Sequence, residues 1–123
     1  MLHRAVDRYW HTVAGVVDAG ESFADAARRE LLEETGLDAP VRDLRMPQTY
    51  RVSDELRHEY EQGVVEVAVE NFTVDVPEGW EPVVNEEHDE YRWLRVPEAI
   101  AIAHWPETVE IIAALATRPS GAQ

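Results

Sequence analysis

Three glutamates, Glu30, Glu33 and Glu34, are the residues whose type and spacing most plainly indicate chemistry. Carboxylates three and four residues apart share one face of a helix, where like charges repel by about a few tenths of a kcal/mol per pair. A sequence selected only for helix stability would not place them so. A hard divalent cation relieves the repulsion, because carboxylate oxygens bind it readily, and a metal held this way usually meets a phosphate on its other side.

The loop before these glutamates fits the same chemistry. It runs from Gly15 to Gly20, and glycine lets the backbone make tight turns and come close to a metal and to phosphate oxygens. The helix then supplies an acidic face at a fixed position relative to the loop. Such a site can set one or more Mg²⁺ ions against a diphosphate, neutralise its charge and lower the pKa of an attacking water, with no covalent enzyme intermediate.

Composition narrows the class of protein. The chain has 123 residues, which suits one domain, and we expect that domain to span residues 1–117 with a flexible tail over 118–123. It has no cysteine, so a reducing cytoplasm is the simplest location. The net charge of −14 argues against nucleic acid as a partner. The apolar stretches are short and broken by charge, so no signal peptide or membrane span is expected.

The elements that position the glutamates can be read along the chain. Ser22 is an N-cap with Asp25 in a capping-box position, and Gly36 ends the helix. Within it, Phe23, Ala27 and Leu31 form the stripe expected to face the core. Alternation and β-propensity predict strands over residues 9–13, 41–46, 48–52, 64–74 and 90–96. Loops are expected over 53–63 and 76–89, a helical turn over 97–103 and a last helix over 106–116.

The spacing from Gly15 to Leu37 resembles the Nudix box at every fixed position. It reads glycine, five residues, Glu21, seven residues, Arg29-Glu30-Leu31, one residue, Glu33-Glu34, one residue, Gly36-Leu37. A Glu-Glu pair near a helix end is, by itself, usually solvated surface, and the full spacing is what favours a metal site. The resemblance implies a family that hydrolyses a nucleoside diphosphate linked to another group, using Mg²⁺ or Mn²⁺, on a three-layer α/β/α fold with a mixed sheet.

The resemblance also implies roles for the residues of the box. Glu30, Glu33 and Glu34 would be metal ligands, the carbonyl of Gly15 a further ligand, and one of these glutamates or a more distant carboxylate the base. Arg29 would hold the set in place, since it lies four residues before Glu33, a separation that permits a helix-face ion pair; its alternative is a surface ion pair without a role. Glu21 would fix the loop to the helix.

A second source of carboxylate is the segment Asn85-Glu86-Glu87-His88-Asp89-Glu90-Tyr91-Arg92-Trp93-Leu94. Many Nudix proteins carry a similar Glu-His followed by an aromatic strand late in the chain. By that likeness Glu87 is the additional metal ligand or catalytic base, with Glu86, Asp89 and Glu90 as alternatives in an acidic loop. His88 is expected to form hydrogen bonds rather than to bind Mg²⁺, which prefers oxygen.

Outer motifs are similar to one branch of the family, the dihydroneopterin triphosphate pyrophosphatases, which also act on nucleoside triphosphates such as dATP. The likeness covers roughly residues 2 to 115 and rests on Leu2-His3-Arg4, Tyr9-Trp10-His11-Thr12-Val13-Ala14-Gly15, Leu56-Arg57-His58-Glu59-Tyr60 and Tyr91-Arg92-Trp93-Leu94. It implies that Arg4 meets phosphate and that Tyr50 lies near the base or sugar. Trp10 would either stack on a base or pack beside a core strand.

Two features depart from the family pattern. Ala14-Gly15-Val16 stands where many Nudix proteins have Pro-Gly-Gly, although the glycine that the box requires is kept. Relatives usually have one or two further strands before Leu2-His3-Arg4, so the N-terminal strands are expected to be short or missing. An unpaired sheet edge there would favour a homodimer.

These observations predict a cytoplasmic Mg²⁺-dependent Nudix pyrophosphohydrolase that cleaves a nucleoside triphosphate or dihydroneopterin triphosphate to the monophosphate and pyrophosphate. Alternatives are a Nudix hydrolase for dinucleoside polyphosphates or nucleotide sugars, a nucleotide sensor that binds without hydrolysis, and an inactive fragment. The repulsive acidic cluster argues against the sensor. The substrate would be set by residues 53–63 and 76–89, outside the box.

Overall fold

The computed structural model of this chain describes residues 1–51 and 66–117. Its helices are α1 (Phe23–Thr35), α2 (Val96–Ile102) and α3 (Pro106–Ala116), and its strands are β1 (Leu2–Arg4), β2 (Trp10–His11), β3 (Arg42–Asp43), β4 (Gln48–Arg51), β5 (Glu66–Val69), β6 (Phe72–Thr73) and β7 (His88–Tyr91). None of the described helices has the length and apolar character needed to cross a lipid bilayer. The predicted loop 53–63 and the predicted tail 118–123 lie outside the described residues.

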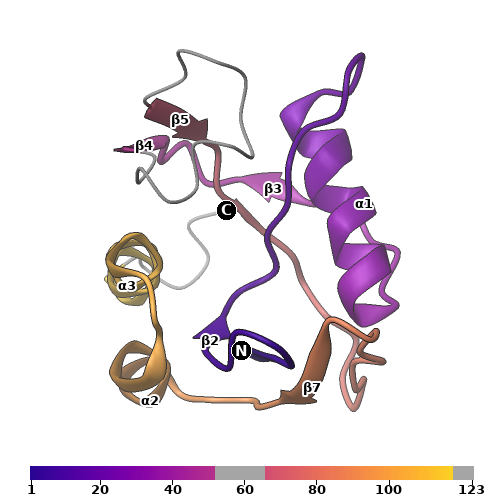
Figure 1. Ribbon diagram of the computed structural model, residues 1–123, viewed down its shortest axis with the longest axis vertical. Helices are drawn as coiled ribbons and strands as arrows, with labels where there is room; N and C mark the ends of the chain where they lie inside the picture. The colour runs from indigo at the N-terminus through magenta and orange to yellow at the C-terminus, as the bar shows by residue number, and fades with distance from the viewer. Residues whose placement is uncertain (52–65, 118–123) are drawn as a thin grey trace.

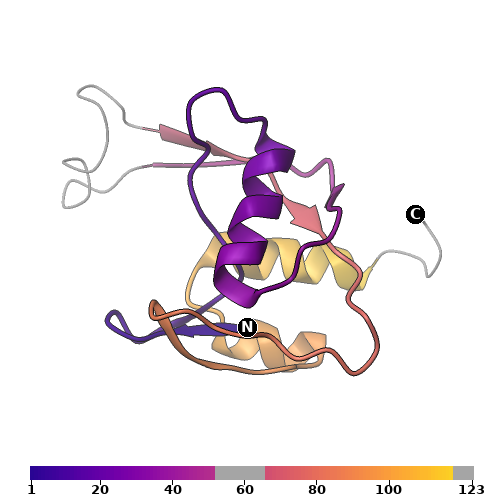
Figure 2. The same cartoon turned by 90° about the vertical axis from the view of Figure 1, so that its right-hand side faces the viewer.

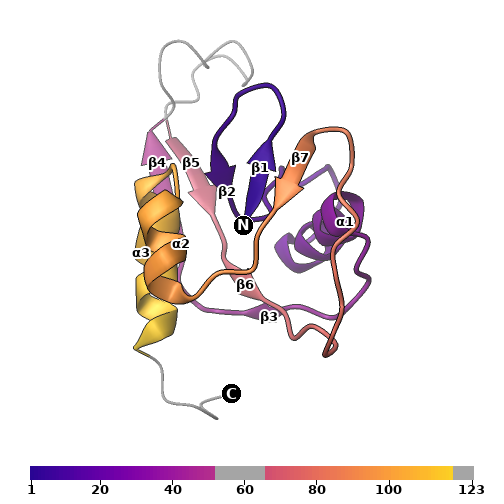
Figure 3. The same ribbon diagram turned by 90° about the horizontal axis from the view of Figure 1, so that it is seen from below.

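Short strands lie between helices on two sides (Figure 1 and Figure 3). Helix α1 covers one side, and α2 and α3 lie next to each other on the other (Figure 2). The strand pairs described are antiparallel, and an isolated parallel bridge joins Trp10 to Ala103 before α3. This arrangement confirms the predicted α/β/α fold.

Helix α1 forms where local signals predict it. The Ser22 Oγ accepts a hydrogen bond of 3.0 Å from the amide of Asp25, and Gly36 ends the helix in the left-handed region at φ 80°. There the Gly36 amide donates to the carbonyl of Leu32 at 2.9 Å. Both caps satisfy backbone groups that have no partner within the helix.

The predicted core stripe of α1 is wrong at its first residue. Phe23 is 43% exposed, whereas Ala26 and Leu31 are buried with Glu34 and Thr35. A stripe at four-residue spacing turns around the helix by about 40° at each step. Phe23 has therefore rotated away from the face that Leu31 buries.

The strands are shorter than predicted because side chains and turns interrupt them. The strand expected over 64–74 is broken between β5 and β6, where Asn71 donates from Nδ2 to the carbonyl of Met46 at 2.8 Å and to Oε1 of Gln48 at 3.0 Å. The break faces Pro47, so β5 pairs with β4 and β6 with β3. The strand expected over 90–96 is shifted to His88–Tyr91, because the chain after it turns into α2.

The strand at the start of the chain is short, as predicted, but it is not a sheet edge. β1 lies between β2 and β7, with Leu2 opposite His11 on one side and Tyr91 on the other. This sheet brings residues 2–11 beside residues 88–91 and sets the mouth of the loop before β7 against the turn after β1. The expectation of an exposed edge at β1, which favoured a dimer, is therefore not supported by this sheet.

Removing the Ser22 hydroxyl should destabilise the helix that carries the glutamates. We expect Ser22→Ala to lower the free energy of unfolding by about 1 kcal/mol, because the amide of Asp25 loses its acceptor. Urea denaturation followed by circular dichroism measures the change. Ser22→Asp is the control, since it keeps an acceptor at the N-cap, and equal losses in both variants would show that the cap is not responsible.

Candidate active site

The Glu34 carboxyl group is the most buried acid of the predicted site. Its residue is 3% exposed, and within the described part of the chain its Oε2 is a buried oxygen without a hydrogen-bond partner. Burial raises the pKa of Glu34 to about 8, with further contributions from the Glu30 carboxyl group and from the charge of Glu87, while the backbone of Ala14 acts in the opposite direction. A crowded group of carboxyls with an unpartnered buried oxygen fits a divalent cation well.

Gly15 lies directly against this group. A Cβ atom placed on Gly15 would overlap the carboxyl group of Glu30, so any side chain there would displace the glutamate. Glycine at this position therefore lets the backbone approach the carboxylate closely. This contact joins Gly15 to Glu30, and the carboxyl group of Glu30 in turn acts on that of Glu34.

Arg29 fastens the loop to the helix. Its Nε donates to Oε2 of Glu21 at 2.8 Å, its Nη2 to the carbonyl of Val16 at 2.8 Å, and its Nη1 to Oε1 of Glu30 at 2.7 Å. The predicted pair with Glu33 is longer, at 3.4 Å. The hydrogen bond to Glu21, followed by that to Glu30, raises the pKa of Arg29, which stays charged.

Glu21 also accepts a hydrogen bond of 2.9 Å from the amide of Asp18. The prediction that Glu21 fixes the loop to the helix is thereby confirmed.

The three glutamates of the helix differ in exposure. The side chain of Glu33 is 54% exposed, that of Glu30 17% and that of Glu34 3%. Their shared helix face therefore runs from solvent at Glu33 to the interior at Glu34. An ion held along this face would have protein on one side and solvent on the other.

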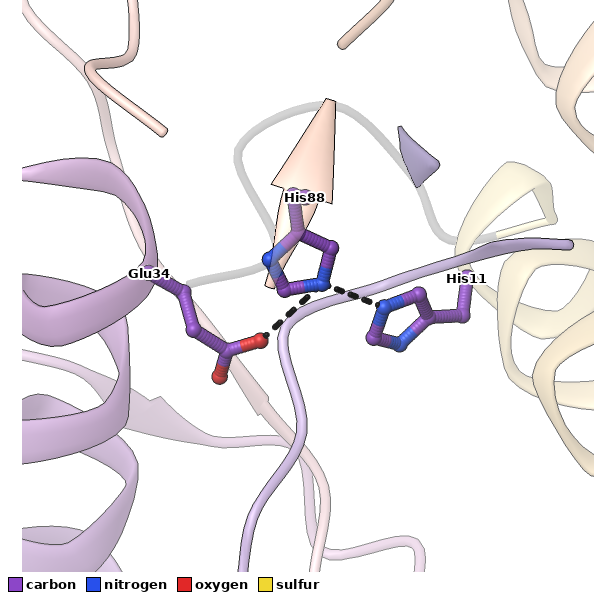
Figure 4. A group of neighbouring side chains, drawn as sticks. All are labelled: His11, Glu34 and His88. Atoms are coloured by element: carbon purple, nitrogen blue, oxygen red, sulfur yellow. Dashed lines mark hydrogen bonds and ion pairs between the residues drawn. The ribbon is translucent and has the colours of Figure 1, made fainter. Parts of the chain in front are cut away.

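Two buried histidines form the inner wall beside Glu34 (Figure 4). The Nε2 atoms of His11 and His88 are 2.7 Å apart, and the two rings stack with centroids 4.9 Å apart. His88 Nε2 lies 3.6 Å from Oε1 of Glu34. The prediction that His88 forms hydrogen bonds is confirmed.

Burial, followed by the charges of His88 and Arg4, lowers the pKa of His11 to about 4, and burial likewise lowers that of His88. Neutral imidazoles can bind metals. Donor atoms of His11, Glu34 and His88 lie within 4.8 Å of one another, so this group also brings nitrogen ligands near the carboxylates. Sequence reasoning missed His11, for which strand alternation was the available signal.

Of the other predicted residues, Glu87 and Arg4 act on this centre through their charges. The amide of Ala5 donates to the Glu87 carbonyl at 2.9 Å, and the charge of Glu87 acts on both Glu34 and Arg4. Arg4 is held by Asp7, through Nε at 2.8 Å and Nη2 at 2.6 Å. Tyr50 lies in β4, in a different strand pair. The guanidinium of Arg92 covers the Trp10 ring at 4.6 Å, which favours packing for that tryptophan.

The site thus combines a glycine loop, an arginine-clamped acidic helix and a buried glutamate on an α/β fold. The NUDIX domain family matches residues 1–115. The chain therefore belongs to the Nudix hydrolase family.

Relatives place it within that family. The dihydroneopterin triphosphate diphosphatase of Escherichia coli (strain K12) is 33% identical over 108 residues, which cover 83% of this chain and 71% of that protein. A structure of the E. coli dihydroneopterin triphosphate pyrophosphohydrolase superposes with a TM-score of 0.81 at 30% identity, covering 93% of this chain and 82% of the other. The octanoyltransferase of Myxococcus xanthus is 36% identical over 92 residues, 75% of this chain but 24% of that protein, so this chain spans about a quarter of its length.

Replacing Glu34 by glutamine should stabilise the metal-free protein at neutral pH. The pKa of Glu34 stands at about 8 in the folded protein, against an ordinary value of 4.5. Protonated Glu34 favours the folded protein over the unfolded chain. This stabilisation is complete below pH 4.5 and is lost as the pH rises through 8, because the unfolded chain releases the Glu34 proton at a lower pH than the folded protein does. We expect Glu34→Gln to gain on the order of 1–3 kcal/mol at pH 7 and nothing near pH 4.5.

Urea denaturation in a chelator at both pH values measures this difference. Glu33→Gln is the matched control, because its side chain is 54% exposed, and it should change the free energy of unfolding by less than about 0.5 kcal/mol. A Glu34→Gln variant that is no more stable than the wild type at pH 7 would contradict the unfavourable burial of this carboxylate.

Proposed function

We propose that this protein is a Mg²⁺-dependent pyrophosphohydrolase that cleaves a nucleoside triphosphate or dihydroneopterin triphosphate to the monophosphate and pyrophosphate. The observation that carries the proposal is the Glu34 carboxyl group, buried beside Glu30 with an unpartnered oxygen. A group so placed lowers stability without a cation and gains a favourable partner with one. The likeness to the E. coli dihydroneopterin triphosphate diphosphatase supports the substrate class.

The ligands would come from two parts of the chain. Glu30, Glu33 and Glu34 on α1 and the carbonyl of Gly15 would hold Mg²⁺, or Mn²⁺ in its place, with Glu87 as a further ligand from the opposite loop. The cation would neutralise charge on the diphosphate and lower the pKa of the attacking water. Because Arg29 donates to Oε1 of Glu30 from one side, it would orient that ligand without occupying the centre of the group.

The remaining residues would bind the substrate and accept a proton from the attacking water. Arg4 would meet a phosphate oxygen. Its Nε and Nη2 both contact Oδ2 of Asp7, which holds the guanidinium on the side of the site where Glu87 acts. A carboxylate, Glu87 or one of the α1 glutamates, would take the proton of the attacking water. Tyr50 would lie near the base or sugar. The oxygen of water would then form the new P–O bond as the phosphoanhydride bond breaks.

The setting of this reaction is also a proposal. The lack of cysteine supports a cytoplasmic location, and the net charge of −14 argues against nucleic acid as a partner. A homodimer stays a prediction, which sedimentation of the purified protein would decide.

Replacing the helix glutamates should abolish hydrolysis while leaving the fold intact. We expect Glu33→Gln and Glu34→Gln each to lower turnover by about 10²-fold or more, because the cation loses a charged ligand in each. Turnover should be measured with Mg²⁺ and a panel of nucleoside triphosphates, dihydroneopterin triphosphate, dinucleoside polyphosphates and nucleotide sugars, identifying both products. Reaction in ¹⁸O-labelled water shows which phosphorus is attacked.

Glu98→Gln is the matched control. Glu98 accepts a hydrogen bond from the amide of Arg95 at the start of α2, in another helix from the glutamates, and this variant should keep wild-type turnover. Near wild-type rates in both Glu33→Gln and Glu34→Gln would overturn the metal assignment. Tight binding of a triphosphate by the wild type without any product would favour the nucleotide sensor.

A further inference from the structure

The two sources of carboxylate in the site belong to separate elements. Glu30, Glu33 and Glu34 lie on α1, whereas Glu87 lies in the turn before β7. For a cation to meet both, the turn must be held at a fixed distance from the end of the helix. The contacts that hold it were not indicated by the box, which ends at Leu37.

Asn85 makes a bridge between them. Its Nδ2 donates to the carbonyl of Glu33 at 3.2 Å, in the last turn of α1, where carbonyls have no partner within the helix. Its Oδ1 accepts from the amide of Glu87 at 3.1 Å and lies 3.3 Å from Nδ1 of His88. Both ends of one short side chain are thus engaged, one with the helix and the other with the turn.

The same contacts hold two residues of the turn beside the site, Glu87 and His88. The amide of Glu87 is held by Asn85 and its carbonyl by the amide of Ala5, so these two bonds fix its backbone without using its carboxyl group. His88, oriented by Asn85 at Nδ1, turns its Nε2 toward Oε1 of Glu34 at 3.6 Å and Nε2 of His11 at 2.7 Å. Figure 4 shows His88 between these two partners.

We infer that Asn85 is a positioning residue that sets Glu87 and His88 against the glutamates of α1 and thereby raises the affinity of the site for its divalent cation. The inference rests on the proposed function. Asn85 touches neither substrate nor cation and acts through the groups it binds. Replacing a residue that holds metal ligands in place typically lowers metal affinity or activity about 10- to 100-fold.

The test is direct binding of Mn²⁺, which electron paramagnetic resonance follows without substrate or turnover. Asn85→Ala should weaken binding by about 10-fold or more. Asn85→Ser keeps a hydroxyl that can accept from the Glu87 amide but is too short to reach the Glu33 carbonyl, so it should be intermediate. Turnover measured against Mg²⁺ concentration should show the same rise in the Mg²⁺ requirement, with less effect at saturating Mg²⁺.

Asn71→Ala is the matched control. Its side chain also bridges two segments, donating to the Met46 carbonyl and to Gln48, in a part-buried position between β5 and β6, outside the sheet of β1, β2 and β7. We expect it to lower thermal stability while leaving Mn²⁺ affinity unchanged. A role for Asn85 that is only structural would make the two asparagine variants alike.

The outcomes separate this inference from the proposed function. Wild-type Mn²⁺ affinity in both Asn85→Ala and Asn85→Ser would overturn the inference, while hydrolysis by the wild type would leave the proposed function standing. A wild type that neither binds Mn²⁺ nor cleaves any triphosphate would overturn both. If Asn85→Ala fails to fold, Asn85→Ser decides, because it keeps the turn and removes only the bridge to α1.

Discussion

The unfavourable burial of the Glu34 carboxyl group is the constraint on which the rest of this structure depends. A carboxylate that is 3% exposed and beside Glu30 opposes folding unless it keeps its proton or meets a cation. The described core is small, and its buried apolar residues are Leu2, Ala26, Leu31, Leu37, Leu44, Ala99 and Ile111. The caps at both ends of α1 are among the local interactions that offset this cost.

The placement of positive charge follows from the same constraint. Arg29 neutralises Glu21 and binds one oxygen of Glu30, but no arginine within residues 1–51 and 66–117 pairs with Glu34. The histidines beside it, His11 and His88, have lowered pKa values. A fixed guanidinium at Glu34 would stabilise the empty protein and compete with a metal ion. By clamping the loop from outside, Arg29 stiffens the ligands and leaves the innermost carboxylate available.

Those features of the fold and site that depend on interactions between residues close in sequence could be predicted. Ser22, Gly36 and the box fixed the bounds of α1, and the contacts of Gly15 and Arg29 follow from spacing within 23 residues. His11 and His88 are 77 residues apart and meet only because β1 pairs with both β2 and β7. The break at Asn71 depends equally on a distant partner, Met46, and the exposure of Phe23 on which neighbours pack against α1.

The proposed ligands come from two kinds of element, the helix α1 of the box and the turn before β7. The ligands proposed on α1 share one rigid element, so their mutual geometry is insensitive to the rest of the chain. Glu87 comes from a turn whose position depends on the Asn85 bridge and on the Ala5 amide. A change in that turn can alter the approach of the last carboxylate without disturbing α1. Under the proposed function, the strength of cation binding therefore depends on this turn as well as on the box.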